Sequence, residues 1–233
     1  MLIDREEIER HNAALAQRLR VARLRQAVCL EDVDYRTPRG LDRALMRTLA
    51  SGKWLQQHNN VLVVGPTGKG KSFLACALGN QGARDGHSVR YQRLSRLLDE
   101  LAVAEGRCAR LLGRLAKIRL LIIDDWLMAR LTGDHRRDLM EVIDDRHQRG
   151  STLLASQIPL ERWHDQIGDP TYADAILDRV VHNAYRIELR GGSMRQRPEL
   201  SAEAKLNTNT DLEQVINDTH TIHKRATTTS KKD

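Results

Sequence analysis

Hydrophobic residues recur along the chain in two alternating patterns. Short, nearly continuous apolar runs such as 61–64 and 120–123 are typical of strands that are buried on both faces. Between these runs lie longer segments in which apolar residues return at every third or fourth position, as on one side of a helix. Because strands and helices alternate, the pattern predicts an α/β fold with a central parallel five-stranded sheet flanked by helices.

The ends of these patterns, together with glycine and proline, place the individual elements. Strands are expected at 61–64, 88–92, 118–124, 151–156 and 184–189. Helices are expected at 5–28, 41–58, 71–85, 94–117 (broken near Gly106), 134–149 and 159–182 (broken near Gly168). We therefore divide the chain into N-terminal helices with a linker (1–58), an α/β core (59–197) and a polar, partly disordered tail (198–233), without a clear C-terminal lid domain.

The segment between the first core strand and its helix carries a phosphate-binding motif. Residues 65–72 read Gly-Pro-Thr-Gly-Lys-Gly-Lys-Ser and fit the pattern G-x-x-x-x-G-K-[ST] at every specified position. Glycines let backbone N–H groups close on a polyphosphate, and the following helix directs its positive end at the same anion. The alternative is a chance glycine-rich turn, but a strand before and a helix after are the context that this motif needs.

We therefore predict a P-loop that binds a nucleotide polyphosphate together with Mg²⁺. The predicted nucleotide-binding residues are Gly65, Pro66, Thr67, Gly68, Lys69, Gly70, Lys71 and Ser72. Lys71 is expected to reach the β- and γ-phosphates, and Ser72 is expected to bind Mg²⁺.

Two acidic residues at the end of a second strand are candidates for hydrolysis. Asp124 and Asp125 follow the apolar run 120–123. In open α/β sheets, ligands bind outside the carboxyl ends of the strands. Asp124 is thus predicted to hold Mg²⁺, and Asp125 to polarise the attacking water. A strand that simply ends in an acidic turn is the alternative, which the complete P-loop upstream disfavours.

A polar pair ends the strand predicted at 151–156. If this strand lies between the P-loop strand and the Asp124 strand, Ser156 and Gln157 point at the γ-phosphate and can sense its presence. The sequence alone favours a polar turn before Pro159 equally well.

Composition narrows the class of protein. The 233 residues are 40% hydrophobic and only 3% aromatic, and the formal net charge is +7. The aliphatic content supports a globular core, while the scarcity of aromatic residues argues against a surface that stacks single-stranded bases. Three cysteines without CxxC spacing are typical of a reducing compartment, and no apolar run is long enough to span a membrane. We therefore expect a cytoplasmic protein without membrane contact.

Several motifs together resemble one family. They are Gly65–Ser72, Leu120–Trp126, Ser156-Gln157 with Pro159, Arg162-Trp163-His164, Ile167–Pro170 and Ala173–Arg179. In combination, over roughly residues 1–197, they resemble the IstB-type ATP-binding transposition helpers, AAA+ proteins related to the DnaC and DnaI helicase loaders. The resemblance implies ATP-dependent self-assembly on duplex DNA without sequence specificity, and assistance to a partner transposase.

The resemblance also implies roles for particular residues. Residues 65–72 correspond to the Walker A loop, Asp124 and Asp125 to the Walker B acids, and Gln157 (or Ser156) to the sensor. Arg179 resembles the arginine finger, which would reach the nucleotide of a neighbouring subunit. A salt bridge from Arg179 to Asp174 or Asp178 in the same chain is an equally good interpretation.

Basic residues cluster in one thirty-residue stretch. Eight arginines and lysines lie between residues 90 and 119, opposed by three acidic residues. Their spacing suits non-specific contact with a phosphate backbone, and a solvated face is the alternative. The predicted DNA-binding residues are Arg93, Arg96, Arg107, Arg110 and Arg114. A second group, at positions 18, 20, 23 and 25, is better interpreted as a solvated helix face.

The sequence as a whole predicts an ATPase with Lys71, Asp125, Gln157 and Arg179 in catalysis. The nearest alternative is a helicase loader of the same branch, which would engage single-stranded DNA. A DNA clamp that binds ATP without hydrolysis is a second alternative. A small-molecule kinase is a third, disfavoured because no arginine-bearing lid is recognisable and the acid pair favours hydrolysis.

Overall fold

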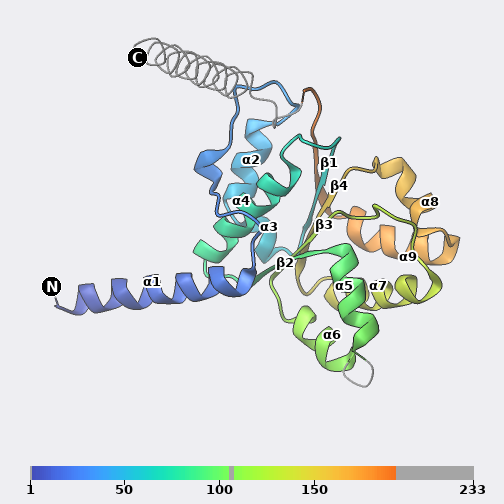
Figure 1. Ribbon diagram of the computed structural model, residues 1–233. Coiled ribbons are helices and arrows are strands. Elements are labelled where there is room, and N and C mark those ends of the chain that lie inside the picture. Colours follow the sequence, from blue (N-terminus) through green and yellow to red (C-terminus); the bar gives the residue numbers. More distant parts are fainter. Residues whose placement is uncertain (1, 105–107, 193–233) are drawn as a thin grey trace, which may run out of the picture. The chain divides into compact units, whose positions relative to one another are not determined.

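A computed structural model describes residues 2–104 and 108–192 (Figure 1). Its strands form one parallel sheet in the order β2-β3-β4-β1-β5. Their bounds are Asn60–Val64 for β1, Val89–Arg93 for β2, Leu120–Asp124 for β3, Ser151–Ser156 for β4 and Ala184–Glu188 for β5. The predicted α/β fold is confirmed, and each predicted strand is present with ends that differ by at most two residues.

The helices occupy the segments between the strands, as predicted. Their bounds are α1 (Leu2–Ala22), α2 (Arg43–Ala50), α3 (Lys53–Gln56), α4 (Lys71–Arg84), α5 (Leu94–Val103), α6 (Cys108–Ala116), α7 (Gly133–Arg146), α8 (Trp163–Ile167) and α9 (Pro170–Val181), with 3-10 turns η1 (Leu30–Asp32) and η2 (Leu160–Arg162). The helix expected at 41–58 is two helices, because Gly52 adopts a left-handed φ of 69° between them. The break predicted near Gly168 is present: Gly168 is left-handed, and Asp169 caps α9 through the Tyr172 N–H.

The N-terminal helix is shorter than the predicted 5–28. α1 ends at Ala22 because Arg23 adopts a left-handed φ of 52°, which a right-handed helix cannot contain. The chain then turns onto the core, where Leu24 packs against α4. A Cβ on Gly79 would lie 2.9 Å from Leu24 Cδ2, so glycine is what lets this segment approach α4 closely.

The strands bury side chains on both faces, and each face has its own helices. Residues that alternate along the strands pack with α1–α4 on one side: Val61, Val63, Leu120, Ile122, Leu153 and Ile187. The intervening residues pack with α5–α9 on the other side: Leu62, Leu121, Ile123 and Leu154. This alternation follows from the two-residue period of a strand and explains why the strands are nearly continuous apolar runs.

Two predictions concern the C-terminal part and membranes. The polar tail predicted at 198–233, and with it the expectation of no clear lid domain, lies outside the described residues. Within 2–104 and 108–192, no helix combines the length and the apolar character needed to cross a bilayer.

A buried guanidinium fastens α7 to the sheet. Arg146 is 1% exposed, and its Nη1 donates to the carbonyl oxygens of Leu115 at 2.6 Å and Ile118 at 2.8 Å. Its other nitrogens donate to the Ser151 carbonyl and to the Thr152 hydroxyl. Burial lowers the pKa of Arg146 to about 10, so this side chain is charged at neutral pH. One cation thus joins the end of α6, the start of β4 and α7.

Replacing Arg146 should destabilise the whole core. We expect Arg146→Met to lower the free energy of unfolding by about 3 kcal/mol, because it leaves two buried carbonyl oxygens and one partly buried one without their charged donor. Urea unfolding followed by circular dichroism measures the loss. The matched control is Arg149→Met, an exposed arginine one turn away, which should change stability by less than about 0.5 kcal/mol. Equal losses in both variants would contradict the fastening role.

Candidate functional site

The glycine-rich loop joins the end of β1 directly to the start of α4. Gly65 and Gly70 have positive φ of 154° and 87°. A Cβ on Gly65 would collide with the Leu189 carbonyl oxygen, and one on Gly70 would lie 2.6 Å from Arg39 Nη1. Glycine is therefore required at both ends of the loop, and the backbone forms a cradle with the N-terminus of α4 behind it. This cradle fits the phosphates of ATP.

A buried arginine braces the loop from behind. Arg39 is 3% exposed and donates from Nη1 to the Lys69 carbonyl and from Nη2 to the Asp34 carbonyl, each at 3.1 Å. Burial lowers the pKa of Arg39. The linker segment that carries Arg39 is thereby fixed to the P-loop, a contact that the sequence did not reveal.

The lysine and the hydroxyl predicted to contact ATP and Mg²⁺ lie in the first turn of α4. Lys71 is 8% exposed, and its Nζ donates to the Pro66 carbonyl at 2.9 Å, so the ammonium group lies inside the curve of the loop. Ser72 Oγ donates to Asp124 Oδ2 at 2.7 Å. The structure therefore brings the end of the P-loop and the end of β3 into direct contact, as the sequence-based assignment of both requires.

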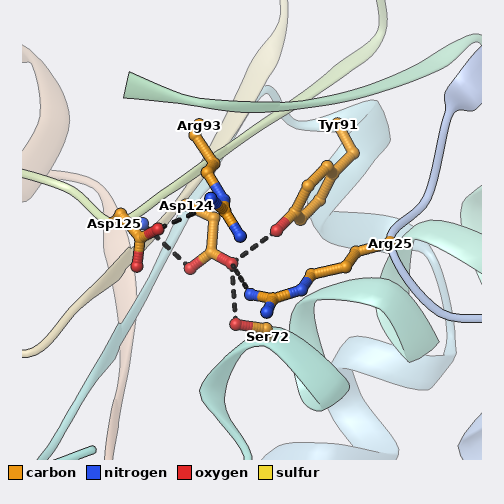
Figure 2. Close-up of polar contacts among 6 residues, drawn as sticks. All are labelled: Arg25, Ser72, Tyr91, Arg93, Asp124 and Asp125. Carbon is orange, nitrogen blue, oxygen red and sulfur yellow. Dashed lines mark hydrogen bonds and ion pairs between the residues drawn. The ribbon is translucent and has the colours of Figure 1, made fainter. Parts of the chain in front are cut away.

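Asp124 is the centre of a small polar network (Figure 2). Its side chain is buried, with 1% exposure, and Oδ2 also accepts a hydrogen bond from the Tyr91 hydroxyl at 2.5 Å. Arg25 Nη1 lies 3.9 Å from the same oxygen. Burial, and then the hydrogen bond to Asp124, raise the pKa of Tyr91, so this hydroxyl stays a donor. The carboxylate is thus held in one orientation by three side chains.

Asp125 faces away from Asp124 and toward β2. It adopts a left-handed φ of 56°, which bends the chain immediately after the strand. Its Oδ2 lies 3.4 Å from Arg93 Nε, and the side chain is partly exposed (Figure 2). The two acids therefore occupy different environments, one buried and one open to solvent. This difference suits one acid to a metal and the other to water.

The residues at the end of β3 and the start of α4 fit a magnesium ion. Mg²⁺ prefers hard oxygen ligands, and the Ser72 hydroxyl and the Asp124 carboxylate supply two of them 2.7 Å apart. Magnesium binding by these two residues remains a prediction.

Gln157, the predicted sensor, lies against the P-loop. β4 lies between β3 and β1 in the sheet, which is the placement that the sensor interpretation needed. Gln157 Oε1 accepts a hydrogen bond from the Thr67 hydroxyl. Ser156, the alternative, is fully buried: its Oγ donates to the Trp126 carbonyl and accepts from the Ile158 N–H. Of the two, only Gln157 is placed to respond to a ligand in the loop.

Arg179 lies at the opposite end of the sheet from the P-loop. Its carbonyl oxygen accepts from Asn60 at the start of β1, roughly 13 Å from the end of that strand at 3.3 Å per residue. Its Nε donates to Asp144 of α7 at 2.8 Å. The intramolecular ion pair is therefore made with Asp144 rather than with Asp174 or Asp178. Within its own chain, Arg179 cannot serve the nucleotide.

The arginines predicted to bind DNA fall into two groups. Arg93 lies beside Asp125, and Arg96 is exposed one turn into α5. Arg110 and Arg114 are both exposed on α6, four residues apart and thus on one face of the helix. Arg107 lies outside the described residues. Arg93 therefore belongs to the acid pair as much as to the basic surface.

Comparison with known proteins places the chain in a family. The model of the family described as IstB-like ATP binding protein matches residues 1–202. The chain belongs to this IstB-like family. The family resemblance predicted from the P-loop, the acid pair and the motifs after β4 is thus confirmed.

Similar proteins cover nearly the same length. The insertion sequence ATP-binding protein y4pL of Sinorhizobium fredii is 52% identical over 198 residues, which are 84% of this chain and 81% of the relative. The insertion sequence IS21 ATP-binding protein of Pseudomonas aeruginosa is 32% identical over 204 residues, 87% of this chain and 77% of the relative. Both relatives therefore align with more than four fifths of this chain.

Solved structures share the fold. DnaI superposes with a TM-score of 0.57 at 18% identity, over 75% of this chain and 93% of that one. The replication initiator DnaA, bound to AMPPCP and single-stranded DNA, gives a TM-score of 0.58 at 16% identity, over 73% of this chain and 52% of that one. At these identities the likeness concerns the fold, and it confirms the expected P-loop AAA+ architecture of this IstB-like protein.

Three side chains of the site were not found from the sequence of this IstB-like protein. Tyr91, Arg25 and Arg39 all act across long sequence separations, on Asp124 or on the P-loop. Tyr91 alone carried a signal in the sequence: it lies in the strand predicted at 88–92 and is one of few aromatic residues. The two arginines lie in segments interpreted as a solvated helix face and a linker, where nothing distinguished them.

Removing the Tyr91 hydroxyl should weaken the response of this IstB-like protein to Mg²⁺. In Tyr91→Phe, Asp124 loses a buried donor that fixes its orientation. We expect the Mg²⁺ concentration for half-maximal binding of a fluorescent ATP analogue to rise about fivefold, equivalent to about 1 kcal/mol. Tyr172→Phe, on the other face of the sheet, is the control and should leave the midpoint unchanged. An unchanged midpoint in Tyr91→Phe would remove Tyr91 from the site.

Proposed function

We propose that this IstB-like protein is an ATPase that assembles on duplex DNA with ATP and Mg²⁺ bound and assists the transposase of an insertion sequence. The names of its relatives as insertion sequence ATP-binding proteins support the biological setting. The observation that carries the biochemical part is the contact between Ser72 and Asp124, with Asp125 beside them. A loop that cradles phosphates and an acid pair that can serve hydrolysis meet at one point.

In the attack of water on the γ-phosphate, each residue of the site has a separate role. Lys71, inside the loop, neutralises charge on the β- and γ-phosphates. Asp125, partly exposed, accepts a hydrogen bond from the attacking water and orients it. Gln157, against Thr67, contacts the terminal phosphate. When bound by Ser72 and Asp124, Mg²⁺ supplies further charge neutralisation to the phosphates.

The position of Arg179 supports assembly of several copies. Because it lies at the opposite end of the sheet from its own P-loop, its guanidinium can assist only the site of a neighbouring subunit. A guanidinium supplied across an interface would make hydrolysis depend on assembly. In a free subunit, Asp144 would hold the side chain until a neighbour's nucleotide competes for it.

Sedimentation velocity tests the proposal directly. The full chain is compared alone, with ATP and Mg²⁺, with a duplex of unrelated sequence, and with all of these together. We expect large complexes only when both ATP and duplex are present. A chain that stays monomeric with both ligands would overturn the proposal. A preference for single-stranded over duplex DNA would support the helicase-loader alternative instead.

Nucleotide titration and phosphate release by Arg179→Ala, measured beside its sedimentation, separate assembly from catalysis. This variant should bind ATP as the parent does but hydrolyse it more slowly than the parent at protein concentrations where the parent assembles. Assembly with ATP and duplex but no measurable hydrolysis by the parent would favour a clamp that holds ATP without turnover.

A further inference from the structure

A groove lined mainly by arginines lies next to the acid pair. It runs between the segment that follows α1, the edge strand β2 and the first turn of α5. Its basic lining residues are Arg23, Arg25, Arg90, Arg93 and Arg96. Two carboxylates, Asp99 and Glu100, are the acidic residues of the lining. The groove therefore carries a strong local excess of positive charge.

Much of this charge has no partner in the described part of the chain. Among residues 2–104 and 108–192, no carboxylate lies within ion-pair distance of Arg23 or Arg96. Arg90 Nη2 lies 3.6 Å from Glu100, but Arg90 Nε is buried without a hydrogen-bond acceptor. Burial, Arg23 and Arg114 all lower the pKa of Arg90. Like charges are thus crowded together, and a bound anion would relieve the repulsion.

The shape of the basic surface favours a long anion over a single phosphate group. More basic side chains lie beyond the lining: Arg114 of α6 is near enough to Arg90 to lower its pKa, and Arg110 lies on the same face of α6 as Arg114. The lining contains one aromatic residue, Tyr91, which is buried and hydrogen-bonded to Asp124. With no exposed ring on which bases could stack, the groove is suited to a phosphate backbone rather than to unpaired bases.

We propose that this arginine groove holds the phosphate backbone of duplex DNA, with the segment after α1 forming one of its walls. The inference rests on the proposed DNA binding and states where the duplex contacts each subunit. It assigns Arg23, Arg25 and Arg90 to the DNA contact, next to Arg93 and Arg96. It also places the DNA beside the nucleotide, because two arginines of the lining, Arg25 and Arg93, lie within ion-pair distance of Asp124 and Asp125 (Figure 2).

A matched pair of double variants tests the groove. Arg23→Gln with Arg96→Gln removes two charges from the groove without touching the acid pair. Arg47→Gln with Arg149→Gln removes two exposed charges elsewhere, so both proteins have the same net charge. Duplex affinity is measured by fluorescence anisotropy with ATP present at several salt concentrations. We expect the groove variant to lose at least about tenfold in affinity, and its slope of log affinity against log salt to fall by about two. The control variant should keep the parental slope.

Failure of the groove assignment and failure of DNA binding itself would give different results in this experiment. If the parent binds duplex and both double variants behave alike, the groove is not the DNA site, although DNA binding stands. If the parent does not bind duplex at all, DNA binding fails and the groove assignment fails with it. ATP affinity measured without DNA should be the same in the parent and the groove variant. A loss of ATP affinity confined to the groove variant would assign these arginines to the nucleotide instead.

Discussion

Lys71→Ala is expected to abolish ATP binding at concentrations that saturate the parent protein. The ammonium group lies inside the P-loop, where it donates to the Pro66 carbonyl, and its loss removes charged hydrogen bonds to two phosphates. We expect the dissociation constant to rise at least about 100-fold, equivalent to about 2.7 kcal/mol, and hydrolysis to disappear with it. Equilibrium titration with a fluorescent ATP analogue measures the change.

Two other lysines make this prediction specific. Lys53→Ala, an exposed position on α3, should leave ATP binding unchanged. Lys69→Ala is the stricter comparison because Lys69 lies in the same loop and is also buried, with 6% exposure. Its side chain is not required by the P-loop pattern, so we expect a loss below about tenfold. A larger loss in Lys69→Ala than in Lys71→Ala would reverse the assignment of the two residues.

Asp125→Asn is expected to separate ATP binding from hydrolysis. The amide keeps the size of the side chain but no longer accepts a proton, so turnover should fall by about 10³. Asp125 is partly exposed and does not contact the P-loop, so affinity for ATP should stay within about threefold of the parent. Steady-state phosphate release and nucleotide titration measure the two quantities.

The control for Asp125 is an exposed aspartate on α7. Asp134→Asn should leave both turnover and affinity unchanged. Parental turnover in Asp125→Asn would show that another group activates the water. A loss of affinity equal to the loss of turnover would instead indicate a role in binding the nucleotide.

The elements of the core could be predicted because each depends on a local signal. A run of four apolar residues, as at 61–64 or 120–123, favours a buried strand for two reasons. The run is shorter than a typical helix, and it consists of valine, leucine and isoleucine. Gly168 and Pro170 mark the start of α9 in the same local way. The P-loop could be predicted because its glycines are required by the backbone itself.

The end of α1 could not be predicted for the opposite reason. Arg23 takes a left-handed conformation that is uncommon for any residue with a side chain. No glycine or proline lies near residue 23 to indicate the end of the helix. The helical pattern therefore seemed to continue to residue 28. Tertiary packing ends the helix earlier than this pattern predicts, because Leu24 packs against α4 beside Gly79. The same turn carries Arg25 to Asp124.

The ion-pair partners of individual arginines could not be predicted from the sequence either. Arg179 could be placed on a helix, but Asp144 lies 35 residues away, so nearer acids were considered first. Arg93 belongs to the basic stretch in the sequence, because charge spacing along a chain says nothing about the Asp125 carboxylate just after the adjacent strand. Contacts of this kind depend on strand order, which becomes known only with the fold.

The chain that follows β5 closes the rear of the P-loop through its backbone. The Leu189 N–H donates to the Val64 carbonyl at 2.8 Å, and the Arg190 N–H donates to the Arg39 carbonyl at 2.8 Å. The Leu189 amide can exchange with deuterium only when the chain after β5 separates from β1, and the Arg190 amide only when that chain separates from the linker that braces the P-loop. Hydrogen-exchange mass spectrometry of a peptide containing residues 189 and 190, recorded with and without each nucleotide, would therefore report whether nucleotide binding changes how often these contacts open.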